Sequence, residues 1–485
     1  MAKIAVNDLP FTITITDTVP QTMNQYGAFI RSFSFTHNLN PLIKSPITDV
    51  PIMYKRFSLS TLAVIVLNAT LLSALMSCSV NPVTGKQELA WVDENWERKI
   101  GEQHYSHQQQ AGGGPYTIDP DLTLYVRSVG KKLAQYSKRS HLPYDFIVLN
   151  DSSPNAWALP GGKIAVNRGL LISLKDEAEL AAVLAHEIVH ADARHSAQSQ
   201  EVGSLISVGQ LAANVLLSNS GYSNKALQQG IAYTGLYGQT RYSRSRELEA
   251  DLYGMQYMSA AGYNPEAAVS LQKTFVALSK GRQSDAFSAL FASHPPSQSR
   301  VAANEQTAWS LKRGGERGKT RYQQEIKKLM DRKPAYDLSD KAKKAIGDKK
   351  YAEAIRLAEQ AIKIEPKESE FYEVKGAAET KLNRSSVALK SFDQAIALNN
   401  QYYSPILRRG ILRYELRSYE SAERDLQASL LLAPTQIAYI KLGEIAEEKD
   451  LCAEANKYYQ LAAKASPQNQ QSLQQKLLAL QARCR

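Results

Sequence analysis

The chain has 485 residues, of which 44% are hydrophobic and 22% charged, and its formal net charge is +11. This length predicts about two domains. Much of the positive charge lies in residues 312–333, and since no nucleic-acid recognition motif accompanies it, we exclude nucleic acid as a partner and expect a solvated linker helix there.

The first 77 residues predict a non-native extension followed by an export signal. Residues 1–52 are polar and aperiodic, and we interpret them as the product of a misassigned start. Residues 53–77 form a signal peptide, in which a short basic segment precedes the uncharged stretch 59–76. A transmembrane helix is the alternative. The string Leu-Met-Ser-Cys resembles the bacterial lipoprotein cleavage box, which implies a lipidated Cys78, and Ser79 implies the periplasmic face of the outer membrane.

Residues 155–169 predict a β-hairpin. The letters L-P-G-G are turn signals between two short apolar runs. An edge strand in this hairpin could bind an extended substrate by main-chain pairing. A purely structural hairpin fits the same residues.

An apolar helical run follows Ser173-x-x-Asp176, which predicts a capping box. The run contains the motif His186-Glu187-x-x-His190. The two histidines lie one turn apart on one face, so both imidazoles can bind one Zn²⁺, and Glu187 beside them can take a proton from water. Two ordinary surface histidines are the alternative.

A second predicted helix supplies acidic residues. Glu247 and Asp251 are four residues apart and share a face. We expect Glu247 to be the third metal ligand and Asp251 to accept the free N–H of a ligating histidine. The alternative is a solvated acidic face paired with Arg244 and Arg246.

These motifs resemble those of the zinc metallopeptidases that include HtpX and the CAAX prenyl proteases. The resemblance covers roughly residues 81–304, through the strings N-A-W-A-L-P-G-G-K-I-A-V-N-R-G, H-E-I-V-H, A-R-H-S-A-Q and R-E-L-E-A-D-L-Y-G. It implies a single Zn²⁺ and peptide-bond hydrolysis. The implied ligands are His186, His190 and Glu247, with Glu187 as general base and Asp251 as supporting carboxylate. A prenyl-type CAAX protease is disfavoured, because no membrane span is evident beyond the signal.

His294 and Arg300 are further candidates for the catalytic site, on a proline-stiffened loop. His294 could fill the open metal position and keep an enzyme latent, or it could stabilise an oxyanion. Arg300 could serve the oxyanion or anchor the loop, and a plain loop histidine is the alternative. Upstream, residues 204–217 predict a buried or lid helix that is too short to span a bilayer, and residues 218–238 predict a mobile loop.

The C-terminal part has an internal period. Four alanines, Ala354, Ala388, Ala422 and Ala455, are spaced by 34, 34 and 33 residues, which is the period of tetratricopeptide repeats. We expect about four repeats, the first degenerate in its opening helix, and a closing helix around 470–481. Their concave face could bind protein segments, or the array could merely pack on the protease. Cys452 and Cys484 could form a disulfide or remain free thiols.

The predicted fold is therefore mainly α. Residues 78–310 form a zincin-type metallopeptidase domain, helical with a small β-sheet or hairpin; residues 311–337 form a basic linker; and residues 338–485 form an α-solenoid. The resemblance implies a periplasmic endopeptidase that cleaves misfolded or misassembled envelope proteins, with repeats that bind substrate or the outer-membrane assembly machinery. The alternative is a periplasmic chaperone or adaptor whose zinc site is latent. Glu187 favours the enzyme, since a structural site needs no general base.

Overall fold

The structure is a computed structural model, which describes residues 78–89, 92–198, 242–280, 286–465 and 470–484. The predicted extension 1–52, signal 53–77, lid helix 204–217 and loop 218–238 lie outside these residues. Within the described part of the chain, no helix combines the length and the apolar character that a membrane span requires.

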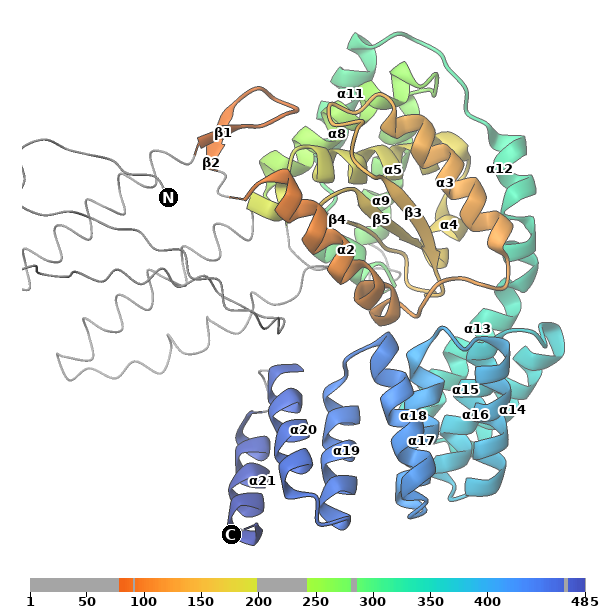
Figure 1. The fold of residues 1–485 in the computed structure, drawn as a ribbon. Helices are drawn as coiled ribbons and strands as arrows, with labels where there is room; N and C mark the ends of the chain where they lie inside the picture. The colour runs from red at the N-terminus through yellow and green to blue at the C-terminus, as the bar shows by residue number, and fades with distance from the viewer. Residues whose placement is uncertain (1–77, 90–91, 199–241, 281–285, 466–469, 485) are drawn as a thin grey trace, which may run out of the picture. The chain divides into compact units, whose positions relative to one another are not determined.

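The first part of the chain combines helices with two small sheets (Figure 1). Its elements are, in chain order, β1 (Cys78–Val80), β2 (Gln87–Leu89), α2 (Glu94–Ala111), α3 (Pro120–Ala134), β3 (Asp145–Leu149), β4 (Ala156–Leu159), β5 (Lys163–Asn167), α4 (Arg168–Ser173), α5 (Glu177–Asp192), α8 (Arg244–Ala260), α9 (Glu266–Lys280), α10 (Ser288–Ser293), α11 (Gln298–Ser310) and α12 (Lys319–Glu325). Strands β1 and β2 pair with each other in antiparallel register.

The larger sheet has the strand order β3-β5-β4, with β5 parallel to β3 and antiparallel to β4. The hairpin predicted for residues 155–169 is confirmed: β4 and β5 are joined through Gly161 and Gly162, whose φ angles of +77° and +83° favour glycine. Strand β4 is an edge strand, because among the described strands it pairs with β5 alone.

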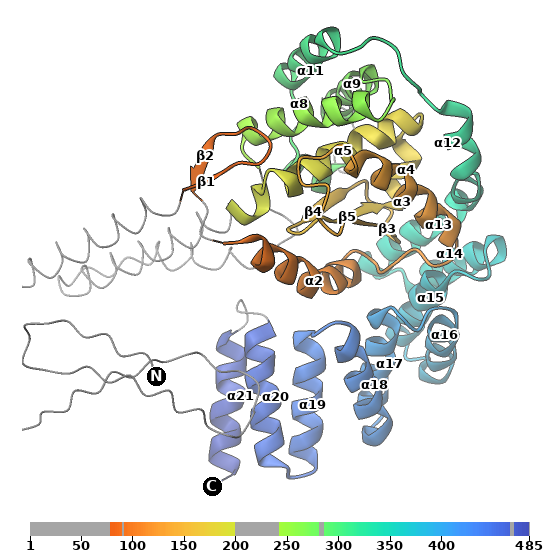
Figure 2. The same cartoon turned by 45° about the horizontal axis from the view of Figure 1, so that its top comes forward.

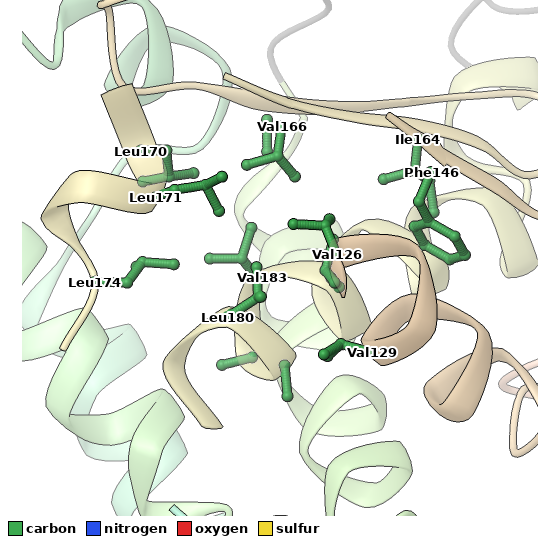
Figure 3. Packing of buried hydrophobic residues seen from close by; sticks show 14 of the residues in the cluster. Val126, Val129, Phe146, Ile164, Val166, Leu170, Leu171, Leu174, Leu180 and Val183 are labelled. Atoms are coloured by element: carbon green, nitrogen blue, oxygen red, sulfur yellow. The ribbon is translucent and has the colours of Figure 1, made fainter. Parts of the chain in front are cut away.

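Both faces of this sheet are covered, as its alternating side chains require. Trp157 and Leu159 of β4 pack on the side of Tyr105 in α2, whereas Ala156 and Ala158 join the main core. Figure 2 shows α2 on one side of the strands and α5 on the other. Where α3, α4 and α5 meet the sheet, the main core consists mostly of aliphatic side chains together with the ring of Phe146, as the close view in Figure 3 shows.

The start of helix α5 corrects one prediction. Ser173 does not cap this helix but ends α4, where its hydroxyl donates to the carbonyl of Gly169 at 3.0 Å. Asp176 is the N-cap instead, and its carboxylate accepts the N–H of Glu179 at 3.0 Å. Leu174 has an extended backbone and interrupts the helical run, so the cap falls three residues later than the spacing predicted.

Helix α8 packs closely on α5 because of one glycine. A Cβ atom at Gly254 would lie 3.2 Å from the backbone nitrogen of His186 and 3.3 Å from the carbonyl carbon of Ala185. The missing side chain therefore lets the two helices that carry the predicted ligands approach each other.

The C-terminal part consists of paired helices (Figure 1). They are α13 (Lys327–Gly347), α14 (Tyr351–Ile364), α15 (Ser369–Lys381), α16 (Ser385–Leu398), α17 (Tyr403–Glu415), α18 (Tyr419–Leu432), α19 (Gln436–Glu448), α20 (Cys452–Ala465) and α21 (Gln470–Arg483). This array of tetratricopeptide-like pairs confirms the predicted α-solenoid.

The small residues that recur along the repeats lie where the helices of the array contact one another. The four alanines spaced by 34, 34 and 33 residues are all fully buried. A Cβ atom at Gly376 would lie 2.8 Å from the ring of Phe392, and one at Gly443 would lie 2.5 Å from the ring of Tyr459. In the pairs α15–α16 and α19–α20, a glycine on the first helix thus accommodates an aromatic side chain of the second. Cys452 and Cys484 form a disulfide that joins α20 to the end of α21.

The basic segment predicted as a linker is helical in α12 and at the start of α13. Its apolar side chains Tyr322 and Leu329 are fully buried in the main core, which the composition of the segment did not indicate. Several of its cations pair with acidic groups of the first domain, such as Arg321 with Glu177 at 2.5 Å.

Candidate metal centre

Two helices and one loop bring four metal-ligating side chains together. Helix α5 supplies His186 and His190, α8 supplies Glu247, and the residue that follows α10 is His294. One potential ligand atom from each lies within 4.8 Å of all the others. His190 and Glu247 are at most 1% exposed, so these residues are neither surface histidines nor part of a solvated acidic face.

The distances between these atoms fit a zinc-sized ion. His186 Nε2 lies 3.0 Å from His190 Nε2 and 3.3 Å from His294 Nδ1. Glu247 Oε1 lies 3.1 Å from His294 Nδ1 and 3.4 Å from His190 Nε2. A tetrahedral ion with bonds of about 2.0–2.1 Å separates its ligands by about 3.3 Å. Three imidazole nitrogens and one carboxylate oxygen are also a donor set that zinc prefers.

The outer nitrogen of His186 is held by Asp251. His186 Nδ1–H donates to Asp251 Oδ1 at 3.0 Å, which leaves the Nε2 lone pair directed at the other donors. Arg300 in turn donates to both Asp251 oxygens at 2.7 Å and lies 2.7 Å from Glu247 Oε2. One buried guanidinium therefore fixes two carboxylates of α8, those of Asp251 and Glu247.

The outer nitrogen of His190 is held by a residue to which the sequence analysis assigned no role. His190 Nδ1 lies 2.8 Å from His195 Nδ1, and His195 Nε2 lies 3.2 Å from Glu249 Oε1. Burial lowers the pKa of His195, so its ring is neutral at neutral pH. Its Nε2–H donates to Glu249, and its Nδ1 is then the acceptor for His190 Nδ1–H. This chain leaves His190 Nε2 free to bind a metal.

Tyr242 is the second residue that the sequence analysis missed. Its ring stacks on that of His190, with centroids 3.8 Å apart and an angle of 15° between the planes. Its hydroxyl bonds to Ser196 Oγ at 2.7 Å. His195 and Ser196 belong to the string A-R-H-S-A-Q, which was noted only for its resemblance, and nothing in the sequence pairs Tyr242 with His190.

The site's electrostatics favour a cation at its centre. Burial lowers the pKa of His186, but Glu247 and Asp251 outweigh it and raise the pKa to about 10. Burial likewise raises the pKa of Glu247, but His294 and His186 hold it well below its usual range. The carboxylates thus stabilise positive charge among the imidazoles, as they would stabilise a bound metal ion.

Glu187 lies beside this donor cluster without joining it. Its Oε1 is 3.5 Å from His294 Nε2, and its Oε2 has no hydrogen-bond partner among the described residues. Burial raises the pKa of the Glu187 carboxyl. The orphaned oxygen is available to a substrate or a water molecule.

His294 and Arg300 are both buried, so neither is an exposed loop residue. His294 is only 8% exposed, and its two ring nitrogens face Glu247 on one side and Glu187 on the other. Arg300 lies in helix α11 and not on the loop where it was predicted. It contacts Asp251 and Glu247 of α8 and the carbonyl of Pro295 at 3.3 Å, so it ties both α8 and the loop to α11.

The family comparison matches the part of the chain that contains this centre. Residues 120–308 match the model of peptidase family M48. The mitochondrial metalloendopeptidase OMA1 of Schizosaccharomyces pombe is 33% identical over 222 residues, which are 45% of this chain and 63% of that protein. The beta-barrel assembly-enhancing protease of Escherichia coli K12 is 30% identical over 202 residues, which are 41% of each chain. The chain thus spans less than two thirds of either relative.

Among solved structures, the first TPR domain of Spaghetti (RPAP3), bound to an HSP90 peptide, aligns with 25% of this chain and 96% of its own. The sequence identity is 28% and the TM-score is 0.24. The metal-binding geometry and the family match concern the same residues, those of helices α5 and α8 and the loop after α10. Residues 120–308 of this chain therefore match peptidase family M48 and contain a donor set that fits a bound metal ion.

Proposed function

We propose that this chain is a zinc endopeptidase. The observation that carries the proposal is the orphaned, buried oxygen of Glu187 beside four convergent metal-ligating atoms. A purely structural metal site would not need such a carboxylate. The family of residues 120–308 supports the same chemistry.

His186, His190 and Glu247 would hold the ion, and Asp251 and His195 would orient the two histidines. A bound Zn²⁺ supplies Lewis acidity to the peptide carbonyl and acidifies water. Glu187 Oε2 accepts a proton from the attacking water and returns it to the nitrogen of the leaving amine. Strand β4 offers its free edge for main-chain pairing with an extended substrate.

His294 would keep this enzyme latent. A catalytic zinc site leaves one position open, and His294 Nδ1 lies where a fourth ligand would lie, 3.3 Å from His186 Nε2 and 3.1 Å from Glu247 Oε1. Activation then requires His294 to leave this position. Its Nε2, 3.5 Å from Glu187, would otherwise suit a role at the oxyanion. We assign Arg300 to anchoring, because its contacts go to Asp251, Glu247 and Pro295.

The presence of His294 as a fourth potential ligand also favours a second candidate function. With His294 bound, the donor set is closed, as in structural zinc sites. A chaperone or assembly adaptor that acts through its repeats and holds a latent metal would need nothing more than this arrangement.

The proposed substrates are misfolded or misassembled envelope proteins, and the repeats would bind these proteins or the outer-membrane assembly machinery. The name of the Escherichia coli relative supports this setting, whereas the OMA1 relatives are named as mitochondrial. We propose the periplasm, with a lipid anchor on Cys78 in the outer membrane. The Cys452–Cys484 disulfide supports an oxidising compartment.

The test compares the chain purified from Cys78 onward with its Glu187→Gln and His294→Ala variants, each loaded with zinc. We expect the wild type to degrade unfolded outer-membrane protein slowly, Glu187→Gln to bind zinc but not to cleave, and His294→Ala to cleave faster. Zinc binding without cleavage by wild type and His294→Ala would refute the peptidase and leave the adaptor. Mass spectrometry of the membrane-extracted chain tests for an acylated Cys78.

A further inference from the structure

A pocket extends from the candidate metal centre into the core of the first domain. Its empty volume is about 500 Å³ when the open solvent at its mouth is included, and His186, Glu187 and His294 line one end of it. Asp251 and Arg300 also line this end, and these two residues are hydrogen-bonded to each other. The pocket is therefore continuous with the groups that would act on a peptide bond.

The other end of the pocket is apolar. It is lined by side chains of four elements: Leu170 of α4, Val183 of α5, Leu271 and Phe275 of α9, and Leu290 of α10. Leu170, Leu271 and Leu290 are buried, and Figure 3 shows Leu170 and Val183 in the packed core. Gln272 and Asn304 are the remaining polar residues of the lining, and neither carries a charge.

We propose that this pocket receives one large apolar side chain of the substrate, from a residue next to the scissile bond. This proposal rests on the peptidase function proposed above and adds a substrate class to it. The chemistry of the wall selects the side chain, because a charged group would lose its hydration there without a partner.

The position of β4 explains why one side chain would enter. Ala156, the first residue of this edge strand, lines the pocket. A peptide that pairs with the free edge of β4 is extended, so its successive side chains point to opposite faces. One residue beside the scissile bond then points towards α5 and the pocket, while its neighbours point away.

Ala268 gives a direct way to fill the pocket. It lies on α9, lines the pocket and is only partly buried, so a larger side chain can be placed there with limited damage to the core. Ala277 lies on the same helix, is exposed and does not line the pocket, so Ala277→Phe is a matched control for Ala268→Phe. Phe275→Ala is the opposite change, since it enlarges the pocket.

The experiment determines cleavage sites in a peptide library for the zinc-loaded full chain and these variants. We expect wild type and Ala277→Phe to prefer leucine, methionine or phenylalanine at one position beside the cut. Ala268→Phe should shift that preference to alanine or glycine and lower kcat/KM for large apolar residues about 10-fold or more. Phe275→Ala should admit tryptophan. The proposal would be overturned if the wild type showed no residue preference at either position beside the cut. It would also be overturned if Ala268→Phe had the same residue preferences as the wild type.

A binding measurement separates this inference from the proposed activity. In the Glu187→Gln background, a labelled peptide with leucine at the preferred position should bind at least about 10-fold more tightly than its aspartate counterpart. Ala268→Phe should abolish this difference, and Ala277→Phe should keep it. A preference in binding, with no cleavage by either the wild type or His294→Ala, refutes the peptidase and retains the pocket as an apolar peptide site. Equal binding of both peptides refutes the pocket.

Discussion

Replacing Asp251 by asparagine should weaken metal binding while leaving the presumed ligands in place. Asp251 Oδ1 accepts hydrogen bonds from His186 Nδ1 at 3.0 Å and from Arg300 Nη2 at 2.7 Å. An asparagine keeps the size of the side chain but loses its charge, and its NH₂ group would face the N–H groups of Arg300. His186 would then be less basic and less well oriented.

The expected loss follows from that geometry. Removing the carboxylate behind a ligating histidine typically weakens metal binding about 10- to 100-fold. This range corresponds to about 1.4–2.7 kcal/mol. The upper half of the range is expected here, because the substitution also leaves the buried Arg300 with Glu247 as its sole carboxylate partner.

Competition with a chromophoric zinc chelator measures this change directly. Asp425→Asn is the matched control: Asp425 is also buried and accepts two hydrogen bonds from one arginine, Arg409, at 2.7 and 2.9 Å, but it lies in the repeat array. We expect Asp425→Asn to bind zinc like the wild type. A Kd for Asp251→Asn within about twofold of the wild type, or an equal loss in Asp425→Asn, would refute the reasoning.

Three further predictions concern the fold and the centre. Burial raises the pKa of Glu177, but hydrogen bonds from Arg321 and two tyrosines outweigh burial, so that the pKa in the folded protein lies below its ordinary value. The ionised carboxylate therefore stabilises the fold above the unfolded pKa of about 4.3, and this stabilisation is lost as the pH falls through the lower folded pKa. In Glu177→Gln, the free energy of unfolding measured in urea should fall less steeply below pH 5 than it does in the wild type. Gly376→Ala would place its Cβ 2.8 Å from a phenylalanine ring and should cost about 1–3 kcal/mol in urea unfolding, whereas Gly347→Ala meets no atom within 4 Å and should not destabilise. His195→Leu should weaken zinc binding about 10-fold, because it removes the acceptor of the His190 N–H, and an equal Kd for His195→Leu and wild type would contradict that role.

The sequence could predict what depends on local periodicity. The spacing of His186 and His190, and of Glu247 and Asp251, places each pair on one helix face without knowledge of the rest of the fold. The turn glycines likewise locate the hairpin, and the period of the small residues locates the repeats. These features are properties of one helix, one turn or one helix pair.

Features that depend on contacts between different helices could not be predicted from the sequence. The partner of His190 is five residues further along, at His195, but the next partner in that chain, Glu249, comes from another helix. Glu249 is two residues from Glu247 and therefore faces a different side of α8, and this direction is what places it beside His195. The start of α5 was misplaced because the extended backbone of Leu174 has no signature in the S-x-x-D pattern.

The packing of Tyr336 has a consequence for the order in which the chain unfolds. Tyr336 of α13 and Phe371 of α15 belong to the same apolar cluster as Leu171 of α4. The guanidinium of Arg168 lies 3.4 Å from the centroid of the Tyr336 ring. The later repeats pack in smaller clusters of their own. Helices α13 to α15 should therefore melt cooperatively with the metallopeptidase domain, while the array can unravel from its C-terminal end inward. Domain borders drawn by repeat homology would cut through that cooperative unit.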